Sequence, residues 1–189
     1  MTAYLLDKNY HNKNYDHDDL NHQEFEFCTF DNCNFSMCNF IAVTFIDCTF
    51  TNCDFSNAMI NHVAFRNAKF IDCTIVAVNF AMCDKLIFEI NFEKCTLDFS
   101  KFYALKMKST TFKDCSIVAA DFMDCDLTDA WFVNCDLYRS EFAGAKAIRT
   151  NFYSSFNYII DPKKTAIKKA NFSLSAVHGL LAKHDIVVV

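Results

Sequence analysis

Bulky apolar residues recur at every fifth position over most of this 189-residue chain. One run extends from Phe25 to Phe80 and a second from Phe92 to Phe152, and seventeen of the 22 phenylalanines occupy these central positions. A period of five matches neither the 3.6-residue period of an α-helix nor the two-residue period of a flat strand. The repeat therefore excludes an ordinary amphipathic helix or flat sheet as the main architecture.

The position two residues before each central residue takes a small side chain. Ten of the eleven cysteines lie there, and only Cys83 does not. The cysteine spacing is mostly five or a multiple of five, which matches no zinc-binding pattern. Free cysteine behaves as a small buried hydrophobe, so we expect these thiols to be structural. With only 2 Gly and 1 Pro, the chain lacks the turn residues of an ordinary all-β protein.

The pattern small–x–Phe/Leu–x–x resembles that of the pentapeptide-repeat family. The resemblance implies an all-β fold, a right-handed quadrilateral β-helix, in which four pentapeptides form one coil and the central and small residues point inward. Residues twenty apart in this sequence form columns of one type, aromatic for Phe92, Phe112, Phe132 and Phe152, and aliphatic for Leu97, Ile117 and Leu137. These columns support a 20-residue coil whose repeats contact only their neighbours.

The repeat divides the chain into three parts. We expect a polar N-terminal segment with a weak first coil in residues 1–24, the β-helix in 25–156, and a turn, a short C-terminal α-helix and a tail in 157–189. Twelve residues separate Phe80 from Phe92, where two units need ten, so two extra residues within 81–91 must bulge or form a loop. Lys85 falls at a central position, and a lone lysine is costly to bury.

A helical stripe and an apolar tail end the chain. Ser173 or Ser175 is a candidate N-cap for the helix. An exposed β-branched tail promotes aggregation, so we expect the stripe and tail to pair with a second copy. The predicted dimer interface consists of Leu174, Val177, Leu180, Leu181, Ile186, Val187 and Val188.

The same ending resembles the Qnr and MfpA branch of the family. The resemblance rests on Asp161-Pro162, Lys168-Lys169-Ala170-Asn171-Phe172-Ser173-Leu174, Gly179-Leu180-Leu181 and Ile186-Val187-Val188. It implies a homodimer that mimics duplex DNA and binds DNA gyrase or topoisomerase IV, and in some members protects the enzyme from fluoroquinolones or toxins.

Acidic residues are concentrated in two segments of the chain. The net charge is −5, with −7 in residues 1–65 and −6 in residues 114–141. An electronegative surface competes for a basic DNA channel. The predicted partner-binding acids are Glu24, Glu26, Asp31, Asp47, Asp54, Asp114, Asp121, Asp124, Asp126, Asp129, Asp136 and Glu141. Those in 114–141 come from all four columns, so we expect them to wrap around the rod. An alternative needs no function: outward positions must be polar, and Asp suits turns.

Several outward positions are apolar, unlike the surface of DNA. They are Ile41, Ile46, Ile71, Val76, Val118, Met123, Val133 and Tyr138. They favour an alternative function, a scaffold that binds another protein partner and has no topoisomerase activity.

The composition argues against other classes of protein. Nearly all the cysteines belong to the core and no glycine-rich phosphate loop is present, so we expect no enzyme, cofactor or metal site. The sequence shows no basic surface with interleaved aromatic residues, so we expect no direct binding to nucleic acid. The N-terminus lacks the features of a signal peptide and no apolar stretch reaches 18 residues, so we expect a cytoplasmic protein outside the membrane, with reduced cysteines.

Overall fold

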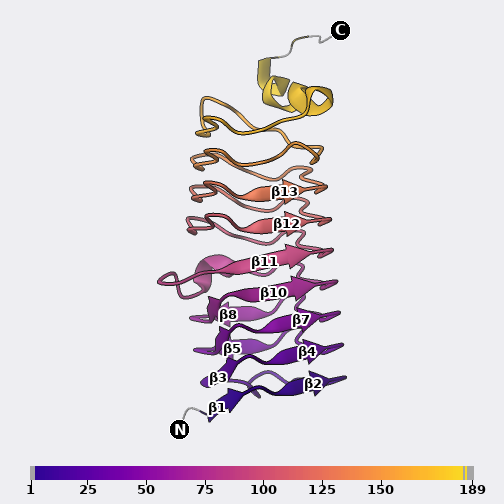
Figure 1. Cartoon of the computed structure of the whole chain (residues 1–189), viewed down its shortest axis with the longest axis vertical. Helices are drawn as coiled ribbons and strands as arrows, with labels where there is room; N and C mark the ends of the chain where they lie inside the picture. The colour runs from indigo at the N-terminus through magenta and orange to yellow at the C-terminus, as the bar shows by residue number, and fades with distance from the viewer. Residues whose placement is uncertain (1–2, 185, 187–189) are drawn as a thin grey trace.

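The chain folds into a rod of stacked coils, with its N-terminus at one end and a short helical cap at the other (Figure 1). The computed structural model describes residues 3–184 and 186. Parallel strands one coil apart pair in register, so that Phe30 lies opposite Phe50 and Phe50 lies opposite Phe70. This is the right-handed quadrilateral β-helix that the resemblance to the pentapeptide-repeat family implies.

Each coil has four faces, which we number in chain order. Face 1 holds the sheet β1-β3-β6-β9, face 2 the sheet β2-β4-β7-β10-β11-β12-β13, and face 4 the pair β5-β8. Face 3 is built from isolated bridges such as Asn34 to Asp54 and Asp54 to Thr74. Faces 1 and 3 therefore lie on opposite sides of the rod. The elements are β1 (Ala3–Leu6), β2 (Asn9–His11), β3 (Gln23–Glu26), β4 (Thr29–Asp31), β5 (Asn39–Ile41), β6 (Thr44–Ile46), β7 (Thr49–Thr51), β8 (Met59–Asn61), β9 (Ala64–Arg66), β10 (Ala68–Ile71), η1 (Phe80–Met82), β11 (Ile90–Glu93), β12 (Thr111–Lys113), β13 (Trp131–Val133), η2 (Leu174–Leu180) and η3 (Ala182–His184).

Stacked aromatic rings fill the interior. On face 2 the ring centroids of Tyr10 and Phe30 are 4.8 Å apart, and those of Phe30 and Phe50 are 4.9 Å apart. Rings of different faces meet edge to face, as Phe112 and Phe122 do at 88°. Both arrangements are favoured by the aromatic quadrupole and add to the large buried area of each ring.

The cysteines share this interior, and Cys83 corrects one expectation. All eleven are buried free thiols. The Cys83 Sγ lies 3.8 Å from the Ile60 carbonyl oxygen, the same 23-residue relation that joins Cys53 to Phe30. Cys83 therefore occupies an inward small position, and the phase of the repeat shifts only after it.

The corners of the coil turn the chain although the sequence has only two glycines. The residue two after most central residues adopts a left-handed conformation, with φ of 53° at Asn32 and 55° at Asp114. Asn and Asp tolerate this region better than most non-glycine residues. Gly144 has φ of 76°, and a Cβ there would lie 2.0 Å from the Asp124 Oδ1, so a larger residue at that corner would require the exposed Asp124 side chain to move.

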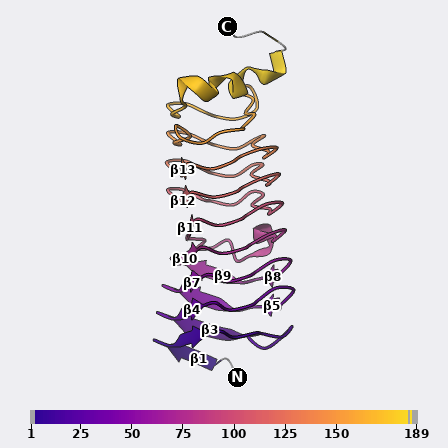
Figure 2. The same ribbon diagram turned by 90° about the vertical axis from the view of Figure 1, so that its right-hand side faces the viewer.

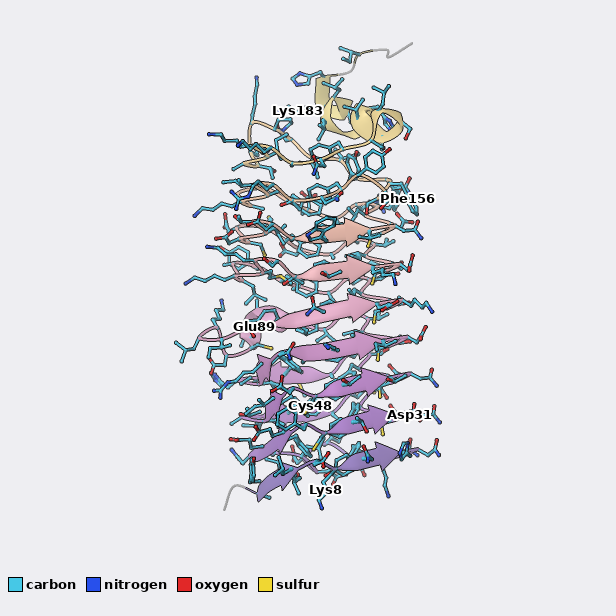
Figure 3. The ribbon with its side chains drawn as sticks, in the orientation of Figure 1. Lys8, Asp31, Cys48, Glu89, Phe156 and Lys183 are labelled. Atoms are coloured by element: carbon cyan, nitrogen blue, oxygen red, sulfur yellow. The ribbon has the colours of Figure 1, made fainter. Side chains whose placement is uncertain are left out.

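The predicted phase break forms a loop on face 1 between Asp84 and Glu89 (Figures 1 and 3). Coil hydrogen bonding continues to the Asp84 N–H and resumes at the Glu89 N–H, which donates to the Phe65 carbonyl at 3.0 Å. Lys85 is exposed, as its charge requires. Phe88 instead turns inward and is only 7% exposed, so it fills the space on face 1 that Lys85 would occupy as a central residue.

The first coil begins at Ala3, earlier than the weak turn expected near Tyr15. Ala3 to Leu6 pair with Gln23 to Glu26 in β3. The Tyr15 ring stacks on Phe35 at 4.8 Å, in phase with the rest of the rod.

A short helical cap covers the C-terminal end, as the sequence predicts, but its turns are of the 3₁₀ type instead of α (Figure 2). Ser173 is the N-cap, and its Oγ accepts a hydrogen bond from the Ala176 N–H at 3.2 Å. A Cβ at Gly179 would lie 2.1 Å from the Tyr158 carbonyl oxygen. Glycine thus lets this short segment pack directly against the last coil. Short helical segments of this length are often of the 3₁₀ type.

Candidate interaction surfaces

The twelve predicted acidic residues lie on the outside of the rod, half-buried or exposed, and are divided among its four faces. Face 1 and its edge carry Glu24, Glu26, Asp47, Asp126 and Asp129; face 2 and its edge Asp31 and Asp114; face 3 Asp54 and Asp136; and face 4 and its edge Asp121, Asp124 and Glu141. The structure therefore brings together only some of them.

The longest acidic row runs along face 3 and includes two residues that the sequence analysis missed, Asp16 and Asp98. With Asp54 and Asp136 they occur at every second coil, about 10 Å apart along the rod axis and over about 30 Å in all. Asp54 and Asp136 precede the central residue of their coil and Asp16 and Asp98 follow it, so the four residues alternate between two adjacent columns of face 3. The outward strand positions of face 3 hold no Lys or Arg between residues 14 and 138. We define these four residues as the acidic row.

Hydrogen bonds from neutral groups hold the carboxylates of this row. Asp54 and Asp136 each accept the backbone N–H two residues further along, at 2.8 and 3.0 Å. Asp98 accepts the Ser116 hydroxyl at 2.7 Å and the Val118 N–H at 2.9 Å. These donors carry no charge, so they hold Asp54, Asp98 and Asp136 in position without pairing them with a cation.

The acids of face 1 in the second acidic segment behave differently. Arg149 donates to both oxygens of Asp129, from Nε at 2.6 Å and Nη2 at 2.5 Å, and this lowers the pKa of Asp129. The Lys108 Nζ lies 3.5 Å from Asp126. Partial burial opposes ionisation of Asp126, but hydrogen bonds from Thr128 and the charge of Lys108 leave its pKa lowered. Cations of this chain therefore offset the charge of both residues.

The loop on face 1 and the coil corner before it expose several apolar side chains. Leu86 at the loop's tip is 84% exposed and the adjacent Ile87 is 43% exposed. Met82, just before the loop, lines a shallow hollow with Met59 one coil below, and each is about half exposed. These four residues are not among the outward apolar positions expected from the sequence: three lie within 81–91, where the regular repeat is interrupted, and Met59 precedes its central residue.

The predicted dimer residues differ in exposure. Leu174 is 91% exposed and Ile186 is 55% exposed. Leu180 packs against the core, while Val177 and Leu181 are half-buried. Val187 and Val188 lie outside the described residues.

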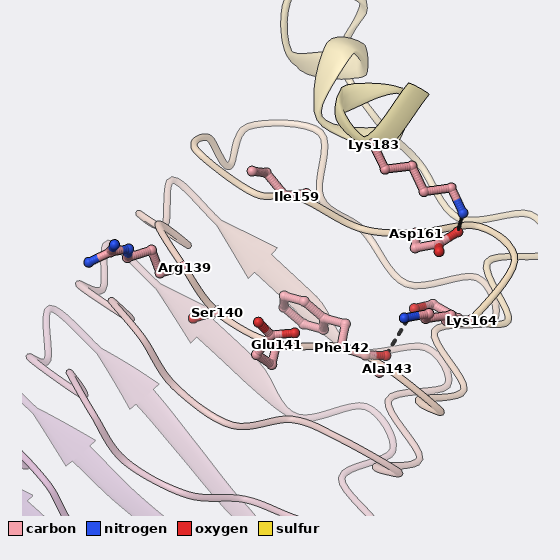
Figure 4. A pocket seen from close by; sticks show the side chains of 10 residues that line it. Arg139, Ser140, Glu141, Phe142, Ala143, Ile159, Asp161, Lys164 and Lys183 are labelled. Carbon is pink, nitrogen blue, oxygen red and sulfur yellow. Dashed lines mark hydrogen bonds and ion pairs between the residues drawn. The ribbon is translucent and has the colours of Figure 1, made fainter. Parts of the chain in front are cut away.

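A cavity of about 450 Å³ separates the cap from the last coils (Figure 4). Glu141, Lys164 and Asp161 line it, and Lys183 of η3 reaches down to form an ion pair with Asp161. The hydrogen bond from Lys183 lowers the pKa of Asp161. The ion pair ties the cap to the coil.

The eleven cysteine thiols are all buried in the rod. Burial raises the pKa of Cys48 and of Cys125 to about 12, so both stay protonated at neutral pH. Within residues 3–184 and 186, no cluster of three or more His, Cys, Asp or Glu side chains is arranged to hold a metal ion. No helix in this described part is long and apolar enough to cross a membrane.

Comparison with known proteins agrees with this geometry. A model of pentapeptide repeats in nine copies matches residues 25–80, and a model of the pentapeptide repeat region matches residues 85–156. The chain belongs to the pentapeptide-repeat family. The two matches leave out residues 81–84, where the phase of the repeat changes.

Solved pentapeptide-repeat structures resemble the rod at low sequence identity. HetL from the cyanobacterium Nostoc sp. strain PCC 7120, a protein involved in heterocyst differentiation regulation, is 13% identical with a TM-score of 0.55, over 91% of this chain and 87% of that one. Full-length QnrB1, a plasmid-mediated fluoroquinolone resistance protein, is 15% identical with a TM-score of 0.43, over 97% and 100% of the chains. No curated protein matches the sequence.

Proposed function

We propose that this pentapeptide-repeat protein is a non-enzymatic, cytoplasmic DNA mimic that binds DNA gyrase or topoisomerase IV and modulates the enzyme or protects it from fluoroquinolones or toxins. The acidic row carries the proposal. Four carboxylates spread over about 30 Å of the rod axis, alternating between two adjacent columns of face 3 with no Lys or Arg at its outward strand positions, present a strip of negative charge on one side of the rod. The resemblance of the C-terminal segment to the Qnr and MfpA branch supports the choice of enzyme.

Shape supports the same proposal. The DNA channel of a type II topoisomerase attracts phosphates through basic side chains, and a rigid row of carboxylates offers them a non-cleavable substitute. In this proposal the C-terminal surface with Leu174 and Ile186 at its most exposed points forms a two-fold homodimer, which doubles the length of the rod.

A competition measurement tests this function. Purified gyrase or topoisomerase IV is bound to a labelled duplex, and the protein is titrated in until the duplex is released. The variant Asp54→Asn/Asp98→Asn/Asp136→Asn keeps the turn hydrogen bonds, because the amide oxygen still accepts, and removes three charges. We expect the concentration of this variant that releases half of the duplex to be at least about tenfold higher than that of the parent protein.

The matched control removes three acids from face 1 with Glu24→Gln, Glu26→Gln and Asp47→Asn. It is expected to compete nearly as well as the parent protein. Equal losses in both variants would show that total charge, and not the acidic row, is what the enzyme recognises.

The exposed loop supports a second candidate function, a scaffold for another protein. Leu86, Ile87, Met82 and Met59 form an apolar patch, which duplex DNA does not have, and isolated patches of this kind often mark protein contacts. Capture of a partner that is lost on Leu86→Ser/Ile87→Ser substitution, with no topoisomerase among the captured proteins, would favour this function over the DNA mimic.

A further inference from the structure

A cluster of cations occupies face 1 near the C-terminal end, on the side of the rod opposite the acidic row. Lys106, Asp126 and Lys146 follow one another in a single bridged column, one coil apart. The Arg149 N–H donates to the Lys168 carbonyl at 3.0 Å, which places the last two coils of the cluster in contact. We define the basic zone as Lys106, Lys108, Lys146, Arg149, Lys168 and Lys169.

The basic zone keeps a positive charge after its internal ion pairs are counted. Its six cations face two carboxylates, those of Asp126 and Asp129, so the net charge of this surface is +4. The ion pairs engage only Lys108 and Arg149. Lys106, Lys146, Lys168 and Lys169 are exposed, and no salt bridge among the described residues involves them; these four are the unpaired lysines.

The chemistry of the surroundings favours phosphate over a protein partner. No aromatic residue occupies an outward position of face 1 between Lys106 and Lys169. Protein interfaces are depleted in lysine and rely on aromatic anchors near their centre. Lysines that act as flexible point charges on a hydrophilic surface are instead typical of contacts with the nucleic-acid backbone.

The dimensions agree with a short stretch of duplex. The basic zone covers three coil steps, about 14 Å. Duplex DNA carries one phosphate per 3.4 Å of axis in each strand, so about four phosphates of one strand lie within that length. We propose that the basic zone binds the phosphate backbone of duplex DNA without sequence specificity.

Opposite faces allow both charges to act together. The acidic row on face 3 repels DNA, so a duplex that binds the basic zone lies on the side of the rod away from the acidic row. A rod whose face 3 occupies an enzyme's DNA channel would leave its basic zone free for a neighbouring DNA segment. The charge totals of sequence segments did not reveal the basic zone, because two acids of the same face, Asp126 and Asp129, lie between Lys106 and Lys146 in the sequence.

Fluorescence anisotropy with a labelled 20-base-pair duplex of mixed sequence tests the proposal, and it requires no topoisomerase. We expect half-saturation below about 100 µM protein in 50 mM salt, and about a 100-fold loss of affinity in 200 mM salt, as four phosphate contacts predict. The variant Lys146→Glu/Lys168→Glu/Lys169→Glu is expected to abolish binding. The matched control Lys69→Glu/Lys94→Glu/Lys101→Glu reverses three exposed lysines on other faces and is expected to retain affinity within about threefold.

Three results would overturn the proposal. The first is no binding by the parent protein at 100 µM in 50 mM salt, and the second is an equal loss in the two variants. The third is equally tight binding of a labelled poly-glutamate of the same charge, which would assign the basic zone to an acidic protein segment. Because the assay holds only this protein and DNA, failure here leaves the topoisomerase proposal standing, and failure of the competition measurement leaves this one standing.

Discussion

Removing one central phenylalanine should show how much each coil depends on its aromatic column. The Phe122 ring is fully buried and stacks on Phe102 at 4.9 Å and on Phe142 at 5.2 Å. It also meets Phe112 and Phe132 edge to face at 5.8 and 5.7 Å. Phe→Ala at buried sites costs about 3–5 kcal/mol through lost transfer energy and the cavity left behind. Because four rings surround this site, we expect about 4 kcal/mol for Phe122→Ala.

Urea denaturation measures this loss. Far-UV circular dichroism reports the whole rod, and the single tryptophan, Trp131, reports the strand β13 next to the site. The control Met123→Ala changes an outward, half-buried neighbour and is expected to cost no more than about 0.5 kcal/mol. A loss below about 1 kcal/mol for Phe122→Ala, or equal losses in the two variants, would refute the assignment of inward and outward positions. Phe122→Asp places an uncompensated charge among the rings and is expected to prevent folding.

Three further predictions concern the cap and the thiols. The lowered pKa of Asp161 means that its ion pair with Lys183 stabilises the cap above the unfolded carboxyl pKa of about 3.9; the hydrogen-exchange protection of η2, measured relative to the intrinsic exchange rate at each pH, should fall as pH falls through the lower folded pKa, and Asp161→Asn should remove that dependence. Truncation before Ser173 should abolish the dimer in light scattering, and a dimer that persists would disprove the proposed interface. The eleven cysteines should react with a thiol reagent at neutral pH only after urea is added, and fast labelling of the folded protein would contradict their burial.

The five-residue period excluded an ordinary helix or flat sheet, and its resemblance to the pentapeptide-repeat family supplied the fold, in which each position of the unit has one orientation. Central and small positions face inward whatever the coil contains, so the aromatic columns and the loop near Lys85 could be read directly from the sequence. The cap differed in helix type because its geometry depends on the close contact between Gly179 and Tyr158, which lie far apart in the sequence.

The acidic row was harder to predict because it depends on the phase of distant coils. Asp54 and Asp98 share a face only once the two extra residues within 81–91 are counted. The 44 residues between them are two coils of twenty, the two inserted residues, and the two positions from before to after the central residue. Charge totals by segment did not reveal this shared face, and they also concealed the pairing of Asp129 with Arg149, one coil away.

Gyrase supercoiling tests the central claim most directly. Relaxed plasmid, gyrase and ATP are incubated with increasing amounts of the protein, with and without a fluoroquinolone. We predict inhibition of supercoiling at micromolar protein, or its rescue in the presence of the drug, and a clear weakening of either effect by Asp54→Asn/Asp98→Asn/Asp136→Asn. Unchanged supercoiling at high protein concentration under both conditions would contradict the DNA-mimic function and direct attention to the apolar patch around Leu86.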